Sequence, residues 1–245
     1  MSTGKTTLAL LLSALLPAGA AWAAGNDTLV YCSEASPESF NPQIASSGPS
    51  FVASSQVLYN RLVTFDPVKN TPIPSLATEW HVSEDGKTWT FTLRQGVKFN
   101  SNKFFKPTRD FNADDVLFSV LRQMDPQHPY HKVSQGNYEY FHDVGLDKLI
   151  KSVKKVDDYH VQFELNEPNA AFLADWGMDF ASILSAEYGE AMLKKGTPEN
   201  VDNWPVGTGP YALQQYKVDS QIRYIANPHY WEGEVPTKHL IFSIT

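Results

Sequence analysis

The chain has 245 residues, of which 42% are hydrophobic and 13% aromatic, a composition that can bury a core and argues against a disordered protein. Its formal net charge is -7, and no cluster of basic residues interrupts the acidic balance. Binding to nucleic acid or to an anionic membrane surface is therefore disfavoured, because both depend on concentrated positive charge.

The first 23 residues predict a secretory signal peptide. Lys5 is their only charged residue, an apolar run extends from Leu8 to Leu16, and Ala21-Trp22-Ala23 supplies the small residues of a cleavage site. A membrane anchor is the alternative, but this run is much shorter than the roughly 20 apolar residues that cross a bilayer. We therefore expect export, with cleavage after Ala23.

The start of the mature chain predicts a strand, a long loop and a helix. Residues Thr28 to Cys32 are typical of a short buried strand, and a loop rich in Ser, Pro, Gly and Asn follows from Ser33 to Ser50. Residues Ser54 to Leu62 predict a helix that buries its apolar side chains. Three prolines between Val63 and Ser75 indicate an extended connection.

Two β-hairpins follow from the alternation of apolar and polar residues. In the first, a turn at Ser83–Lys87 with glycine at its sharpest point leads into a strand over Thr88–Arg94. In the second, strands over Lys151–Val156 and Tyr159–Leu165 are joined by a turn at Asp157-Asp158. The return strands place these apolar residues on one face: Trp89, Phe91 and Leu93 in the first hairpin, Val161, Phe163 and Leu165 in the second.

Two helices have recognisable starts. Asn112 can cap a helix that carries Asp115 in its first turn and ends before Pro126. Ser185 can cap a second helix over Glu187–Lys195, whose last turn holds two lysines. Hairpins and separate helices together indicate an α/β or α+β fold.

The last part of the chain predicts strands over Tyr211–Tyr216, Gln221–Ile225 and Leu240–Thr245. The final strand stops without a turn or polar tail, and we interpret the chain as a fragment. Cys32 is the only cysteine. In an oxidising compartment it indicates either a partner outside the chain or a small buried residue of the first strand.

No residue pattern predicts catalysis, a metal site or a cofactor. His128 and His131 flank Pro129-Tyr130, and we interpret them as surface histidines of a loop, since a metal site needs further ligands. The pairs Asp114-Asp115 and Asp157-Asp158 are explained by a helix start and a hairpin turn. No nucleophile-elbow pattern surrounds the hydroxyls that a triad would use, namely Ser33, Ser36, Ser46, Ser47 and Ser185. The chain is therefore expected not to be an enzyme.

Several longer runs resemble the extracytoplasmic solute-binding proteins of peptide ABC transporters. The opening run Leu29–Pro42 and the hairpin run Leu76–Phe99 are similar to that family's first strand and signature hairpin. Phe111–Val116 and Pro205–Tyr211 are similar to two more of its motifs. Beyond the general signature, resemblance to the dipeptide-binding members extends to Pro129–Val133, Phe172–Asp175 and Met178–Ser185.

This resemblance implies an α/β, two-lobed fold of the periplasmic-binding-protein type with an extra inserted domain. Residues 28–57 and 206–245 would belong to lobe one, residues 58–205 would form the inserted mixed domain, and lobe two would be absent from the chain. Ser46, Ser47 and Gly48 would match an extended segment whose backbone runs along the bound peptide, although a simple polar turn is the alternative. Cys32 would form a disulfide with a cysteine beyond residue 245.

The implied function is periplasmic capture of a dipeptide or short peptide by a monomer that delivers it to an inner-membrane ABC permease. A haem- or metal-chelate-binding paralogue is the alternative within the family, and an exported hydrolase is a more distant one. The charged groups that would hold the two peptide ends lie in lobe two. We therefore expect the 245-residue chain alone to bind ligand weakly or not at all.

Overall fold

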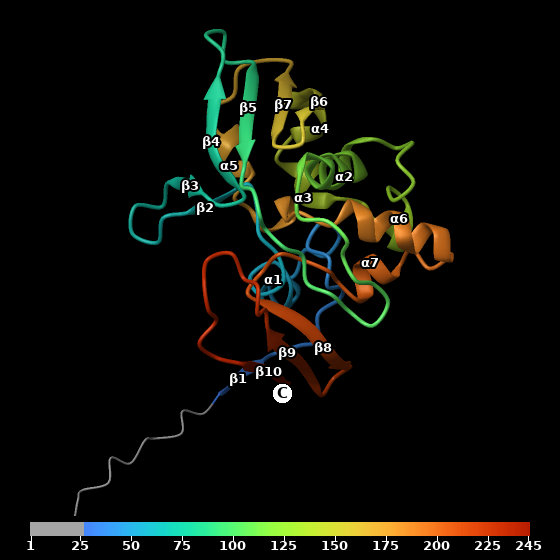
Figure 1. Cartoon of the computed structure of the whole chain (residues 1–245). Coiled ribbons are helices and arrows are strands. Elements are labelled where there is room, and N and C mark those ends of the chain that lie inside the picture. Colours follow the sequence, from blue (N-terminus) through green and yellow to red (C-terminus); the bar gives the residue numbers. More distant parts are fainter. Residues whose placement is uncertain (1–26) are drawn as a thin grey trace, which may run out of the picture.

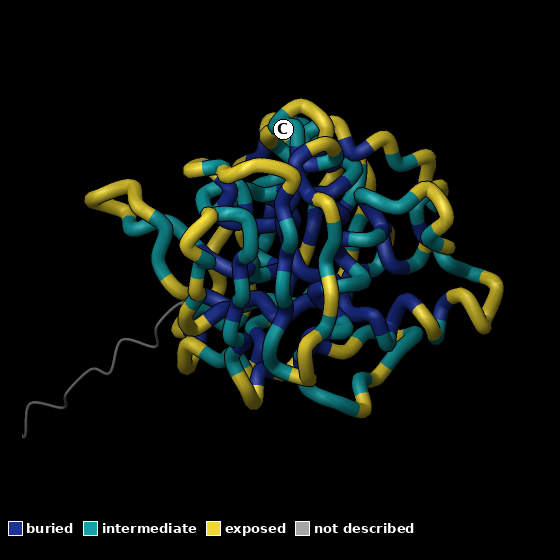
Figure 2. The backbone as a smooth tube through the Cα atoms, turned by 90° about the horizontal axis from the view of Figure 1, so that it is seen from above, coloured by how far each residue is buried: buried dark blue, intermediate teal, exposed yellow. Residues whose placement is uncertain are grey.

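The computed structural model describes residues 27–245, so the predicted signal peptide at residues 1–23 lies outside it. Two four-stranded sheets lie at opposite ends of the molecule (Figure 1). Buried segments run through the middle of the molecule, and exposed segments form its outer loops (Figure 2). Within the described part of the chain, no helix is long and apolar enough to cross a membrane.

The first sheet is built from both ends of the described chain. Its strand order is β1 (Thr28–Ser33), β10 (His239–Ile244), β9 (Gln221–Ala226) and β8 (Tyr211–Lys217). β1 pairs with β10 in parallel, whereas the other neighbours are antiparallel. The predicted strands are confirmed at both ends of the chain.

The predicted burial of β1 is wrong. Leu29, Val30 and Tyr31 are 55%, 57% and 44% exposed. The reason is topological, because among residues 27–245 β1 lies at the edge of the sheet and pairs with β10 alone. Strand β10 lies inside the sheet instead, and its Leu240 and Phe242 are buried.

The second sheet lies wholly within residues 58–205 and confirms both predicted hairpins. Its order is β4 (Ala77–Val82), β5 (Thr88–Leu93), β7 (His160–Leu165) and β6 (Ile150–Asp157), all antiparallel. The predicted inward faces of β5 and β7 are buried, and Phe91 packs edge-on against Phe163. The boundaries of an inserted domain at residues 58 and 205 stay a prediction.

The two predicted helices are present with their predicted caps. Helix α2 (Ala113–Met124) begins with a capping box. The side chain of Asn112 accepts from the backbone N–H of Asp115, and the side chain of Asp115 accepts from the backbone N–H of Asn112. Helix α6 (Ala186–Lys195) begins at Ser185, which accepts from the N–H of Tyr188, and ends at Gly196 in the left-handed conformation.

Shorter elements complete the fold. They are α1 (Gly48–Ala53), β2 (Val63–Phe65), β3 (Pro72–Pro74), α3 (Glu139–Asp143), α4 (Leu146–Leu149), α5 (Phe172–Asp175), α7 (Asn200–Asn203) and the 3-10 turns Val133–Gln135 and Asp179–Ala181. The predicted extended connection between Val63 and Ser75 contains the β2–β3 pair.

The helix predicted over Ser54–Leu62 is wrong. Helix α1 lies earlier, with Pro49 in its first turn, and its last residue is Ala53. The hydroxyl of Ser54 donates to the carbonyl of Ser50, and the chain then passes through a turn into an extended path. Leu58 and Leu62 are buried as expected, but tertiary packing and not helical periodicity buries them.

The chain passes twice between the two sheets, and the two passages lie side by side. The N–H of Gly209 donates to Leu58 O at 3.0 Å, and the N–H of Tyr211 donates to Val57 O at 3.0 Å. A Cβ at Gly207 would lie only 1.9 Å from Leu58 O. Glycine is therefore required there by the close approach of the two backbones.

Candidate functional site

The loop that contains the predicted peptide-binding segment leaves the first sheet at the carboxyl end of β1. Because β1 and β10 are parallel, their carboxyl ends meet at one edge, where the N–H of Thr245 donates to Ser33 O at 3.0 Å. Ligands of open α/β sheets bind beyond the carboxyl ends of parallel strands. The loop that continues from Ser33 therefore starts at the edge where a ligand is expected.

Ser46, Ser47 and Gly48 lie between this loop and helix α1. The side chain of Ser47 is engaged internally, because its hydroxyl donates to Ser50 Oγ at 2.9 Å and its carbonyl accepts from the N–H of Phe51 at 3.1 Å. Ser46 is only partly buried, and within residues 27–245 its backbone N–H and C=O form no hydrogen bond with other backbone groups. These groups are available to an external partner.

Gly48 is exposed, and its surroundings are open. An added Cβ would meet no atom within 4 Å, and the residue begins α1 with ordinary helical geometry. The folded chain therefore gives no steric reason for glycine at this position. A larger side chain at this position would extend into open space beside the loop.

The histidines His128 and His131 are half-buried, which corrects the prediction of surface histidines. Nδ1 of His128 accepts from the N–H of Tyr130 at 3.2 Å, and Nδ1 of His131 lies 2.8 Å from Arg122 O. Burial lowers the pKa of His128, and the positive charge of Arg122 lowers it further. The part of the chain described by the structure contains no His, Cys, Asp and Glu cluster suited to a metal ion.

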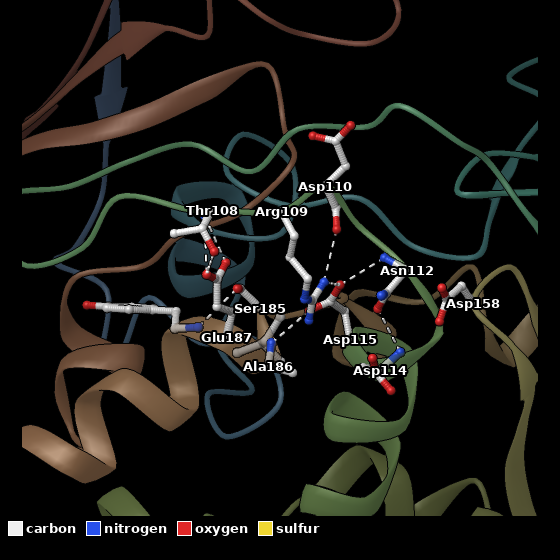
Figure 3. A network of polar contacts seen from close by, with 12 residues as sticks. Thr108, Arg109, Asp110, Asn112, Asp114, Asp115, Asp158, Ser185, Ala186 and Glu187 are labelled. Atoms are coloured by element: carbon white, nitrogen blue, oxygen red, sulfur yellow. Dashed lines mark hydrogen bonds and ion pairs between the residues drawn. The ribbon is translucent and has the colours of Figure 1, made fainter.

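The carboxylate of Asp115 lies at the centre of a network of hydrogen bonds (Figure 3). It is buried and accepts two bonds from Arg109, at 2.7 and 2.9 Å, one from the N–H of Asn112 and one from the N–H of Ala186. Burial raises the pKa of Asp115, and its hydrogen bonds from Arg109 oppose that change. The network joins the first turns of α2 and α6.

The other flagged hydroxyls also have structural partners. Ser33 donates to Ala35 O, Ser36 donates to a carboxylate oxygen of Asp219, and Ser185 caps α6. None of these hydroxyls bonds a histidine in the described part of the chain.

Cys32 is unpaired within residues 27–245 and exposed on the edge strand β1. Exposure corrects the interpretation of a small buried residue. The predicted disulfide with a cysteine beyond residue 245 stays a prediction.

Cavities that the sequence did not predict lie at other places. One of about 340 Å³ separates residues 98–110 from the turn 227–229 and is lined by Lys98, Lys106, Arg109 and His229 among others. Another of about 620 Å³ lies under the connection between β9 and β10. Neither is lined by the residues from Ser46 to Gly48.

Two side-chain amides just before Ser46, those of Asn41 and Gln43, are buried, which the sequence did not predict. Both donate to groups of the segment 58–205, Asn41 to Asp202 and Gln43 to backbone carbonyls. A loop rich in Ser, Pro and Asn gave no signal that its amides would be buried, because their partners are distant in sequence.

Comparison with known proteins gives consistent matches over most of the chain. Residues 71–245 match the family model described as "Bacterial extracellular solute-binding proteins, family 5 Middle". The chain is 58% identical over 243 residues to a dipeptide-binding protein of Escherichia coli (strain K12), with 99% of this chain and 45% of the relative covered. It is 52% identical over 219 residues to heme-binding protein A of Haemophilus influenzae, covering 89% and 40%.

Solved structures give the same result. A dipeptide-binding protein of Pseudoalteromonas sp. SM9913 in complex with Met-Leu is 45% identical, with a TM-score of 0.87 over 89% of this chain and 43% of that one. HbpA2 of Haemophilus parasuis is 50% identical, with the same TM-score and the same coverage. The chain thus spans less than half the length of these relatives.

Proposed function

The chain belongs to the bacterial extracellular solute-binding proteins of family 5, and on this premise we propose that the protein containing it captures dipeptides or other short peptides. In this proposal the captured peptide is delivered to an inner-membrane ABC permease. The protein acts in the periplasm as a monomer and catalyses no reaction.

One observation carries the peptide assignment within this chain. The backbone groups of Ser46 have no backbone partner among residues 27–245, and the neighbouring Gly48 has no side chain to cover them. Exposed backbone donors and acceptors can pair with a peptide main chain whatever its side chains are. The similarity to a dipeptide-binding protein bound to Met-Leu supports the same ligand class.

A haem-binding function is the second candidate, because a heme-binding protein is 52% identical to this chain. Haem iron is usually held by a His, Cys, Met or Tyr side chain. The segment around Ser46 offers hydroxyl and backbone groups instead, which favours a peptide. The calorimetric titration described next also distinguishes a metal-chelate ligand from a peptide.

Isothermal titration calorimetry on the full-length protein tests the proposal. We expect saturable uptake of dipeptides and no uptake of haem or of a nickel–histidine chelate. Binding of haem or chelate without any dipeptide binding would assign the protein to the alternative.

A size series at Gly48 tests the site itself. Since an added side chain meets open space in this chain, Gly48→Ala and Gly48→Trp should leave the unfolding temperature nearly unchanged. Peptide affinity should fall progressively with side-chain size, by tenfold or more for Gly48→Trp. Unchanged affinity in Gly48→Trp would remove the segment Ser46–Gly48 from the ligand site.

The 245-residue chain by itself should bind peptide weakly or not at all. Backbone contacts from one side leave the charged peptide ends in water, so little net free energy remains after the cost of ordering the ligand. Micromolar dipeptide affinity of the isolated chain would contradict this expectation.

Export is tested by the mass of the mature protein. Cleavage after Ala23 predicts a periplasmic product whose first residue is Ala24. An intact N-terminus in the periplasmic fraction would contradict the cleavage site.

A further inference from the structure

The loop between β1 and α1 is attached to two separate parts of the molecule. Its first half is attached to the first sheet, where Ser36 donates to Asp219 at 2.9 Å and Phe40 packs edge-on against Tyr216. Its second half turns toward the segment 58–205, which we call the inserted segment. There the polar side chains of Asn41 and Gln43 are almost completely buried, at 0% and 3% exposure.

Asn41 is attached to a buried ion pair. Its amide donates to Asp202 Oδ1 at 2.8 Å. Nη2 of Arg122 donates to Oδ2 of the same carboxylate at 2.8 Å, and Nη1 of Arg122 lies 2.8 Å from Oδ1. The side chains of Arg122 and Asp202 are 0% and 1% exposed. Because Arg122 contacts both oxygens of the carboxylate, the ion pair limits its rotation and fixes the direction of its bond to Asn41.

The two oxygens of the Asp202 carboxylate have different partners. Oδ2 accepts from the hydroxyl of Ser134 at 2.6 Å and from Nη2 of Arg122 at 2.8 Å, whereas the hydrogen bond to Oδ1 comes from Asn41. The Asn41 contact therefore satisfies the buried carboxylate and gives the loop a fixed attachment point.

Asn41 and Gln43 also fix the shape of the loop. The N–H of Gln43 donates to Asn41 Oδ1 at 2.9 Å, and the N–H of Ala45 donates to Asn41 O at 3.2 Å, which closes a turn. The amide of Gln43 donates to the carbonyls of Ser119 and Ser182, at 3.0 and 3.3 Å. Ala45 is buried at the end of this turn, and Ser46 follows it directly.

The chain is attached to the inserted segment again just after Gly48. Phe51 of α1 packs edge-on against Tyr140 of α3, with ring centroids 5.5 Å apart. Ser55 bonds the carboxylate of Asp179. The residues from Ser46 to Gly48 thus form a short bridge between two attachment points, both on the inserted segment.

We propose that the inserted segment positions the backbone that binds the peptide. The Arg122–Asp202 pair holds Asn41, and Asn41 in turn fixes Ser46–Gly48 in the conformation that meets the ligand. This inference rests on the proposed function and gives the inserted segment a role that requires no contact of its own with the peptide. A backbone that is already ordered loses less entropy on binding, so its attachment raises affinity. Asn41 and Asp202 are positioning residues in this scheme.

The test compares two matched asparagines in the full-length protein. Asn227 is 4% exposed, accepts from the N–H of His229 at 2.9 Å and donates to Gly209 O at 3.0 Å, so it matches Asn41 in burial and turn geometry but donates to a carbonyl and not to a carboxylate. Asn41→Ala and Asn227→Ala should both lower the unfolding temperature, Asn41→Ala by more because bonds to charged groups are stronger. Only Asn41→Ala should weaken dipeptide binding, by tenfold or more.

Hydrogen exchange followed by mass spectrometry provides a readout without ligand. Asn41→Ala should speed exchange of the backbone amides of Ile44 and Ala45, which both bond the carbonyl of Asn41, by at least tenfold, whereas Asn227→Ala should leave them unchanged. Equal effects of the two substitutions, or slow exchange at these amides in Asn41→Ala, would overturn the inference. If the unaltered protein bound no dipeptide, the proposed function would fail, and the exchange rates would still decide whether Asn41 orders the segment.

Discussion

Removing the carboxylate of Asp202 should be among the most damaging single changes in this protein. Asp202→Ala leaves the guanidinium of Arg122 buried without its counter-ion, in a site where both side chains are at most 1% exposed. Burial by itself lowers the pKa of Arg122, but the Asp202 carboxylate outweighs this and raises it. Without Asp202 the guanidinium still stays charged, because arginine is not deprotonated in proteins, and the uncompensated buried charge costs about 3–5 kcal/mol.

Urea unfolding followed by tryptophan fluorescence measures this cost. With a slope of about 3 kcal/mol per molar urea, a loss of about 4 kcal/mol lowers the midpoint by roughly 1.3 M. The double substitution Arg122→Met and Asp202→Leu removes both charges and should recover at least half of the loss, because an apolar pair of similar volume needs no counter-ion. The bonds from Asn41 and Ser134 are not recovered, so return to full stability is not expected.

Two results would refute this reasoning. A loss below about 1 kcal/mol in Asp202→Ala would mean that water or another acceptor replaces the carboxylate. A double variant less stable than either single variant would mean that the pair is not a coupled ion pair.

Three other changes have defined outcomes. Gly207→Ala should lower the free energy of unfolding by about 3 kcal/mol in urea titrations, because its Cβ would lie 1.9 Å from Leu58 O. Gly48→Ala should change the free energy of unfolding by less than about 0.5 kcal/mol, because its Cβ meets open space. Equal effects of the two substitutions would contradict the packing argument. The pKa of His128 is lowered in the folded state, so its contribution to stability is complete above the unfolded pKa of about 6.5 and is lost as the pH falls through the folded pKa. His128→Gln should therefore flatten the pH dependence of the unfolding temperature in that range. An unchanged profile would exclude His128 as the source of the pH dependence. In the native full-length protein, Cys32 should resist thiol labelling until reductant is added, as a disulfide requires, and labelling without reductant would disprove the pairing.

The amino-acid sequence by itself determined the elements whose signals are local. Helix α2 follows from Asn112 and Asp115, which cap it, and from the proline that ends it. The hairpin of β4 and β5 follows from strict alternation around a glycine turn, because side chains on successive strand residues point to opposite faces. The resemblance to the solute-binding family predicted the fold as well as the single elements, and the comparisons confirm both the family and the fold class.

Only the tertiary structure decided which segments are covered and which partners the polar residues find. β1 has an apolar sequence, yet it is exposed because its place at the edge of the sheet depends on pairing with β10 from the other end of the chain. Asn41 and Gln43 look like loop residues, yet they are buried because Asp202 and the carbonyl of Ser119 meet them in space. Local patterns report how a segment can hydrogen-bond to itself or to its neighbours, whereas burial and long-range pairing depend on chain segments that no local window contains.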